Sequence, residues 1–90
     1  MFGYKEFISV AKQTVFDMAV EGLDPTDKVK FTLNDVYVTW FGFILGDMKA
    51  LLSTTLTDGK YYEVTYNDEK KEIYADCYVK IKQTIVDMKL

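Results

Sequence analysis

The stretch that decides the fold is Val36-Tyr-Val-Thr-Trp-Phe-Gly-Phe-Ile44, followed by Met48-Lys-Ala-Leu-Leu-Ser-Thr-Thr55, Tyr61-Tyr-Glu-Val-Thr-Tyr66 and Lys71-Glu-Ile-Tyr74. These segments are rich in β-branched and aromatic residues, which are enriched in strands. Short turn signals separate them, such as Thr57-Asp-Gly59, which suits a three-residue hairpin with glycine in the left-handed conformation. The stretch therefore predicts four strands joined as one antiparallel meander.

The turns also predict which side chains share a face of the sheet, because residues opposite each other on paired strands point to the same side. The expected partners are Trp40 with Leu52, Leu52 with Val64, and Val64 with Ile73. The first face is then mostly apolar, with Val36, Val38, Trp40, Ile44, Met48, Ala50, Leu52, Tyr62, Val64, Tyr66 and Ile73. The second face mixes polar groups with large apolar side chains, namely Tyr37, Phe41, Phe43, Leu51, Tyr61 and Tyr74. We expect the first face to form the core.

Helical periodicity appears on both sides of the meander. Phe7, Ala11 and Val15 recur at a spacing of four, which predicts a helix over about residues 4–21, with Gly22 as its end. Near the end of the chain, Ile81 and Ile85 belong to a second stripe, and this predicts a helix over about residues 76–89. Packing both helices on the first face gives one α+β domain over residues 1–90, in two layers, with the order α-β-β-β-β-α.

One alternative concerns the first strand. The residues Thr32-Leu-Asn-Asp35 resemble an N-capping box with aspartate in place of glutamate, which would start a buried helix over residues 35–45. The density of Val, Tyr, Thr, Trp and Phe after Asp35 favours a strand.

Composition narrows the function classes. Ninety residues suit one small domain, and a hydrophobic content of 49% argues against intrinsic disorder. All eleven basic residues are lysine and the net charge is −3, so the chain lacks the arginine that nucleic-acid readers prefer, and no direct nucleic-acid binding is expected. We see neither a secretory signal nor a stretch that could cross a membrane, and expect a cytoplasmic protein without membrane contact.

Catalytic chemistry has little support in the residues. The chain has no histidine, which excludes the commonest general base, and its single cysteine, Cys77, is expected as a small buried residue near the start of the second helix. We therefore assign no catalytic, metal-binding or cofactor-binding residue, and expect no cofactor and no enzymatic activity.

The second face is the candidate interaction surface. Aromatic side chains interleaved with hydroxyl groups are typical of protein–protein contact patches. The six candidate residues are Tyr37, Phe41, Phe43, Leu51, Tyr61 and Tyr74. A helix, the N-terminal loop or a second subunit could instead cover this face.

Residues 32–79 resemble a known family. The segments Asp35-Val-Tyr-Val-Thr-Trp-Phe41, Lys49-Ala-Leu-Leu-Ser-Thr-Thr55, Tyr61-Tyr-Glu-Val-Thr-Tyr-Asn67 and Lys70-Lys-Glu-Ile-Tyr74 resemble small uncharacterised proteins of phages and prophages of low-GC Gram-positive bacteria. The resemblance implies a phage accessory protein that acts in the cytoplasm of the bacterial host, and it implies no catalytic residue.

Three hypotheses for the function follow. The first is a non-enzymatic interaction module that binds a host or phage protein through the second face and inhibits it, as an antagonist of a defence protein would. The second is a structural homo-oligomer that buries the second face between subunits. The third, with the least support in the sequence, is a module that binds a nucleotide or another small ligand.

Overall fold

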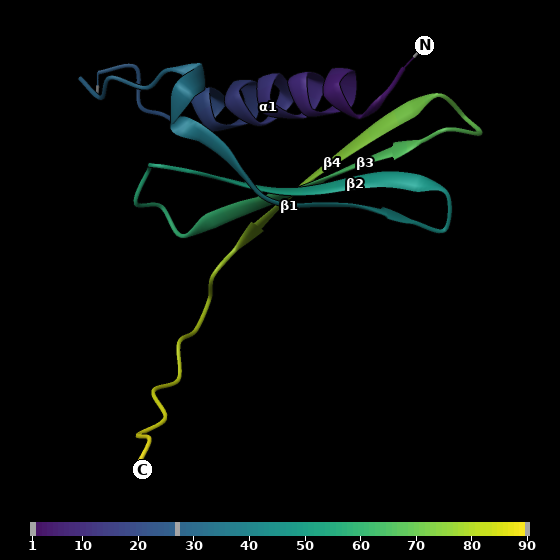
Figure 1. Ribbon diagram of the computed structural model, residues 1–90. Coiled ribbons are helices and arrows are strands. Elements are labelled where there is room, and N and C mark those ends of the chain that lie inside the picture. Colours follow the sequence, from purple (N-terminus) through teal and green to yellow (C-terminus); the bar gives the residue numbers. More distant parts are fainter. Residues whose placement is uncertain (1, 27, 90) are drawn as a thin grey trace.

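A long helix lies across one side of a four-stranded sheet (Figure 1). This computed structural model describes residues 2–26 and 28–89. The elements are α1 (Tyr4–Glu21), the 3-10 turn η1 (Leu33–Asp35), β1 (Val36–Ile44), β2 (Asp47–Thr54), β3 (Lys60–Asn67) and β4 (Glu72–Val79). The strands pair in the order β1-β2-β3-β4, all antiparallel, so the predicted meander and the α+β class are confirmed.

Helix α1 has the bounds that the sequence predicts. Every fourth residue is fully or nearly fully buried against the sheet, namely Phe7, Ala11, Val15 and Ala19. Ahead of the first turn, the Gly3 N–H donates a hydrogen bond of 3.0 Å to the Glu6 carboxylate, which satisfies a backbone donor that the helix itself leaves free. The periodic stripe thus predicts both the length of α1 and the side that it presents to the sheet.

The segment before β1 explains the competing helix signal. The Asp35 carboxylate accepts a hydrogen bond of 2.8 Å from the Thr32 N–H, as in a capping box. The box closes only the short turn η1, because Val36 already begins the pairing of β1 with β2. The alternative of a helix over residues 35–45 is therefore wrong.

A β-bulge at Thr39 interrupts the alternation of β1. Val38 pairs with Leu52, whereas Trp40 pairs with Leu51, so Thr39 has no partner residue of its own. Instead, its hydroxyl donates a hydrogen bond of 3.1 Å to the Leu51 carbonyl. One extra residue on one strand reverses the side to which all following side chains point.

The second half of β1 consequently departs from the predicted faces. Phe41 pairs with Ala50 and its ring centroid lies 6.0 Å from that of Phe7, so its placement on the second face is wrong. Phe43 likewise lies on the helix side. Trp40, predicted for the core, points to the opposite side and is 43% exposed. Ile44 follows Trp40 to that side, so its assignment to the core face is also wrong.

The two later hairpins keep the predicted faces but are shifted by two residues. Leu52 pairs with Tyr62 rather than with Val64, because the loop between β2 and β3 is longer than the predicted three-residue turn. Val64 pairs with Ala75 rather than with Ile73. An even shift retains the side of every residue, so the core assignments on β2 and β3 are confirmed.

The predicted C-terminal helix over residues 76–89 is wrong. Strand β4 continues to Val79, because its residues beyond Tyr74 pair with the first half of β3. Residues 80–89, which we call the tail, form neither helix nor strand and project away from the sheet (Figure 1). Ten residues are too few for a helix to be stable without a surface to pack against, even though their apolar spacing is helical.

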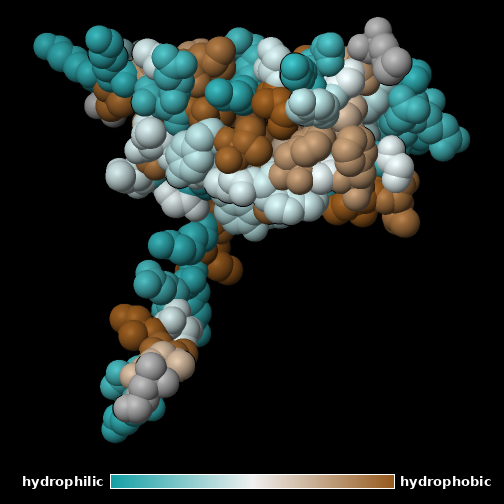
Figure 2. Space-filling view, in the orientation of Figure 1, coloured by the Kyte–Doolittle hydropathy of each residue, from teal (hydrophilic) through white to brown (hydrophobic). Residues whose placement is uncertain are grey.

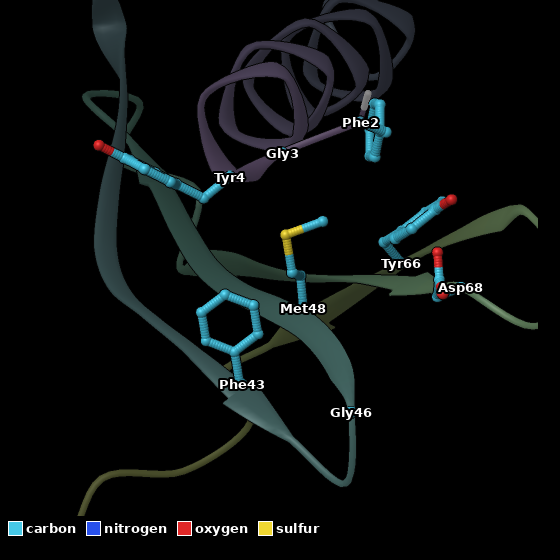
Figure 3. Close-up of a pocket in the computed structure, with 8 residues that line it drawn as sticks. All are labelled: Phe2, Gly3, Tyr4, Phe43, Gly46, Met48, Tyr66 and Asp68. Atoms are coloured by element: carbon cyan, nitrogen blue, oxygen red, sulfur yellow. The ribbon is translucent and has the colours of Figure 1, made fainter.

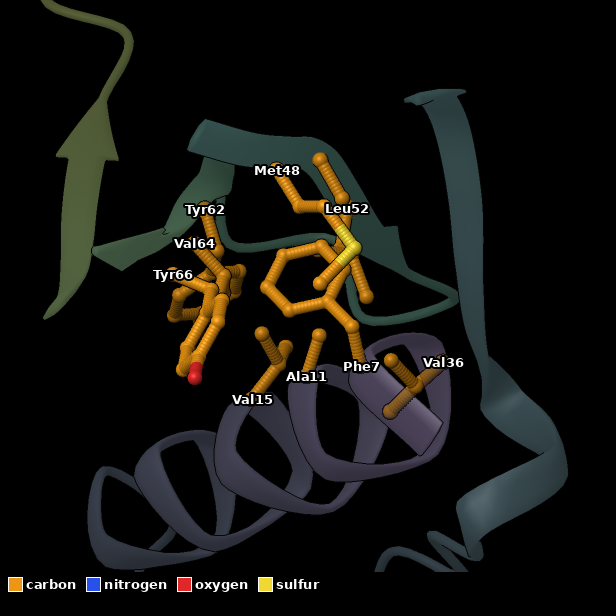
Figure 4. Close-up of a cluster of buried hydrophobic side chains, with 10 residues drawn as sticks. Phe7, Ala11, Val15, Val36, Met48, Leu52, Tyr62, Val64 and Tyr66 are labelled. Atoms are coloured by element: carbon orange, nitrogen blue, oxygen red, sulfur yellow. The ribbon is translucent and has the colours of Figure 1, made fainter. Parts of the chain in front are cut away.

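The core lies between α1 and the helix side of the sheet (Figure 4). The buried cluster consists of Phe7, Ala11, Val15, Val36, Met48, Ala50, Leu52, Tyr62, Val64 and Tyr66. Fully burying an aliphatic or aromatic side chain of this kind stabilises a fold by about 1.5–3 kcal/mol. This single layer of contacts is what holds α1 on the sheet.

Tyr62 is expected to make the free energy of unfolding depend on pH in the alkaline range. Burial, with smaller effects of Cys77 and Asp58, raises the pKa of Tyr62 to about 12, against about 10 for an unfolded tyrosine. The folded state favours the neutral hydroxyl, so this stabilisation is full below about pH 10 and is lost as the pH rises to about 12. Over that range we expect the free energy of unfolding to fall by on the order of 1–2 kcal/mol more in the wild type than in Tyr62→Phe. Urea unfolding of both proteins at several alkaline pH values measures the difference. An equal decrease of the free energy of unfolding with pH in the two proteins would contradict the prediction.

Candidate functional site

The side of the sheet opposite α1, which we call the second face, carries a group of exposed aromatic residues. They are Tyr37, Trp40, Tyr61, Tyr74 and Tyr78, each between 40% and 48% exposed. Four of the six residues predicted for this surface lie on it, namely Tyr37, Leu51, Tyr61 and Tyr74. Among the described residues, α1 is the only helix longer than a single turn, and it lies on the other side.

The sequence prediction missed two of the aromatic residues of this surface, Trp40 and Tyr78. Trp40 reaches the second face only because of the bulge at Thr39. Tyr78 reaches it because β4 continues beyond Tyr74. A signal for Tyr78 was present in the spacing of two between Tyr74, Asp76 and Tyr78, which is the period of a strand.

Two contacts hold aromatic rings of the second face in place. The rings of Tyr61 and Tyr78, which are paired residues of β3 and β4, stack with centroids 5.0 Å apart and an interplanar angle of 15°. The Trp40 indole lies over Gly42, where a Cβ atom would come within 2.6 Å of the ring. The absence of a side chain at Gly42 therefore makes room for the indole next to its own strand.

Carboxylates gather where β3 meets β4 on this face. Glu63 and Asp76 lie opposite each other, and like charges in such a pair destabilise a sheet. The Lys49 ammonium lies 3.4 Å from the Glu63 carboxylate and offsets part of this charge, whereas Asp76 forms no ion pair with any residue that the structure describes. The negative charge of Glu63, then burial and the charge of Asp76, raise the pKa of Tyr78. Two carboxylates and one ammonium therefore leave a net negative charge at this end of the face.

A shallow pocket lies on the helix side, between the start of α1 and the first hairpin (Figure 3). Its volume is about 210 Å³, and its lining consists of Phe2, Gly3, Tyr4, Phe43, Gly46, Met48, Tyr66 and Asp68. Phe43 lies here rather than on the second face. The lining is mostly apolar with one carboxylate, so the pocket suits an apolar side chain.

No constellation for metal-assisted chemistry appears within residues 2–26 and 28–89, where no three metal-ligating side chains come together. Cys77, expected to be buried at the start of a helix, lies instead in β4 and is exposed. Over the same residues, no helix is long and apolar enough to cross a membrane.

A protein-family model described as a family of unknown function (DUF6275) matches residues 8–88. The chain belongs to this family. The expectation that the protein falls in an uncharacterised family is thereby confirmed, and the DUF6275 match assigns no role to any residue. No curated protein and no solved structure matches the chain significantly.

The DUF6275 match also shows how much of the chain belongs to the family domain. It includes most of α1, the whole sheet and all but the last residues of the tail. The second face and the tail are thus parts of the same DUF6275 domain. On the second face, aromatic rings supply contact area, while tyrosine hydroxyls and carboxylates supply hydrogen-bonding groups around them.

Proposed function

We propose that this DUF6275 domain is a non-enzymatic protein–protein interaction module that binds its partner through the second face. The observation that carries the proposal is the set of half-exposed aromatic residues on a side of the sheet that α1 leaves uncovered. Tyrosine and tryptophan are enriched in the energetically dominant positions of protein interfaces, because their rings bury a large area at a low cost in conformational entropy.

The proposed setting is a phage or prophage of a low-GC Gram-positive bacterium, in which the protein is an accessory protein in the cytoplasm of the host. The resemblance of residues 32–79 to phage-encoded proteins supports this setting, and the use of lysine as the sole basic residue agrees with an A/T-rich genome. The partner is a host or phage protein, such as a defence protein that the binding inhibits. The proposed function involves no cofactor, no nucleic acid and no membrane.

Two other functions have an observation in their favour. The tail, which carries exposed apolar residues, favours a structural homo-oligomer. The pocket of about 210 Å³ on the helix side favours a small-ligand module. Thermal unfolding in the presence of nucleotides tests the latter, and a rise of several degrees with one of them would favour it over the interaction module.

The stacked pair gives a direct test of the interaction surface. Tyr61→Ala combined with Tyr78→Ala should weaken capture of the partner from a host lysate by about thirtyfold or more, since a pair at the centre of an interface contributes about 2 kcal/mol or more. Both side chains are more than 40% exposed, so the melting temperature should change little. Quantitative mass spectrometry of the captured proteins measures the loss.

A matched control removes exposed apolar side chains from α1 and from the turn between β1 and β2. Tyr4→Ala combined with Leu45→Ala changes two exposed residues away from the second face and should capture the same partner as the wild type. Equal capture by the double tyrosine variant would reject the second face as the contact surface.

A further inference from the structure

The tail has an apolar side that nothing in its own domain covers. Figure 2 shows hydrophobic residues along the projecting segment, and Ile81, Ile85, Val86 and Met88 are all more than 70% exposed. Ile81, Ile85 and Met88 follow one another at spacings of four and three residues, so they form one stripe if the tail is helical. Apolar residues of helical spacing without a packing surface are typical of a segment that becomes ordered on binding.

The charges of the tail are complementary to those of the second face. Lys82 and Lys89 are seven residues apart, so on a helix both flank the apolar stripe on the same side, about 10 Å apart along the axis. Glu72 and Asp76 lie on β4 of the second face, about 13 Å apart along the strand. Both are exposed and neither forms an ion pair among the described residues. The second face, with its aromatic rings and carboxylates, and the tail, with its apolar stripe and flanking lysines, therefore have matching chemistry.

The direction of the tail favours an intermolecular contact. The Lys80 N–H donates a hydrogen bond of 2.9 Å to the Gly59 carbonyl, which continues the path of β4 past its last residue. Residues 80–86, which follow β4 directly, contain no glycine, proline, asparagine, aspartate or serine, the residues that dominate tight reversals. The tail projects away from the sheet on the side opposite α1 (Figure 1). The tail therefore stands off from its own second face instead of lying along it, and its side chains are open to the second face of another molecule.

We propose that a second copy of this chain covers the second face in the free protein, with the tail of each copy bound across the second face of the other. The apolar stripe of the tail contacts Tyr74 and Tyr78, and Lys82 and Lys89 pair with the carboxylates of β4. A two-fold dimer satisfies both halves at once, since each copy supplies one tail and one face. The inference rests on the proposed function, because it names the occupant that a partner protein must displace.

Reversing the charges of the tail in one variant, and those of the second face in another, tests whether the tail of one copy binds the second face of the other. One variant carries Lys82→Glu and Lys89→Glu in the tail, and the other carries Glu72→Lys and Asp76→Lys on the face. Each alone should weaken the dimer by tenfold or more, because like charges then meet. In an equimolar mixture every tail meets a face of opposite charge, so a heterodimer should form. Native mass spectrometry and light scattering at about 100 µM measure both effects.

The controls keep the result interpretable even where a variant changes stability. Lys5→Glu combined with Lys70→Glu makes the same change in net charge at exposed positions outside the tail and should remain dimeric. Ile81→Asn combined with Ile85→Asn changes side chains that are almost wholly exposed, so it should fold normally and yet be monomeric.

Three outcomes would overturn the proposal. The first is a wild-type protein that stays monomeric up to about 1 mM. The second is a dimer that survives truncation of the chain after Lys80. The third is a failure of the two charge variants to form a heterodimer when mixed, which would show that the tail does not pair with the second face of the other copy. None of these three outcomes changes the expected loss of partner capture in the double variant of Tyr61 and Tyr78. The dimer and the proposed function are therefore tested by separate experiments.

Discussion

Replacing Phe7 by alanine is expected to lower the free energy of unfolding by about 3–5 kcal/mol. Phe7 is fully buried in the layer between α1 and the sheet, and its ring contacts Phe41 on β1. The substitution leaves a cavity that α1 cannot close without losing its other contacts. Small domains have a total stability of about 5–15 kcal/mol, so a large share of the molecules should be unfolded at moderate temperature. Urea unfolding followed by circular dichroism measures the change.

Val10→Ala is the matched control for this prediction. Val10 lies on the same helix but on its outer side, where it is 38% exposed, and its truncation should cost about 1 kcal/mol or less. A loss at Val10 as large as the loss at Phe7 would contradict the account in which one buried side of α1 holds the two layers together.

The parts of the fold that follow from local pattern could be predicted from the sequence. The stripe that contains Phe7, Ala11 and Val15 is a property of eighteen consecutive residues, and it correctly predicts the bounds of α1. The strands of the meander are likewise predicted by β-branched and aromatic composition and by the turn signals between them. Gly59, expected in the left-handed conformation, has φ of +71°.

The C-terminal part shows where local pattern is insufficient. Residues 76–79 have both helical and strand spacing, and the pairing with β3 decides between them. That pairing depends on residues 13 to 19 positions away in the sequence, such as Tyr61, which lies opposite Tyr78 and is 17 positions from it. Helical spacing therefore remains only in the tail, where no surface of the same domain stabilises it.

On the strands without a bulge, the sequence correctly predicts which residues lie on the second face. Tyr61 and Tyr74 keep their predicted side because a register shift of two residues does not change the side of a residue. On β1, a bulge at Thr39 leaves no recognisable mark in the sequence, since threonine is an ordinary strand residue. It exchanges Phe41 for Trp40 on the second face.

The bulge itself can be tested by comparing two adjacent residues. Phe41→Ala should lower the free energy of unfolding by about 2–3 kcal/mol, because the ring packs against Phe7 and is partly buried. Trp40→Ala removes a larger side chain but should cost about 1 kcal/mol, because the indole lies on the outer side and is 43% exposed. Regular alternation along β1 would predict the reverse order. Urea unfolding of the two variants therefore decides which ring belongs to the core, and a greater loss for Trp40→Ala would contradict the bulge.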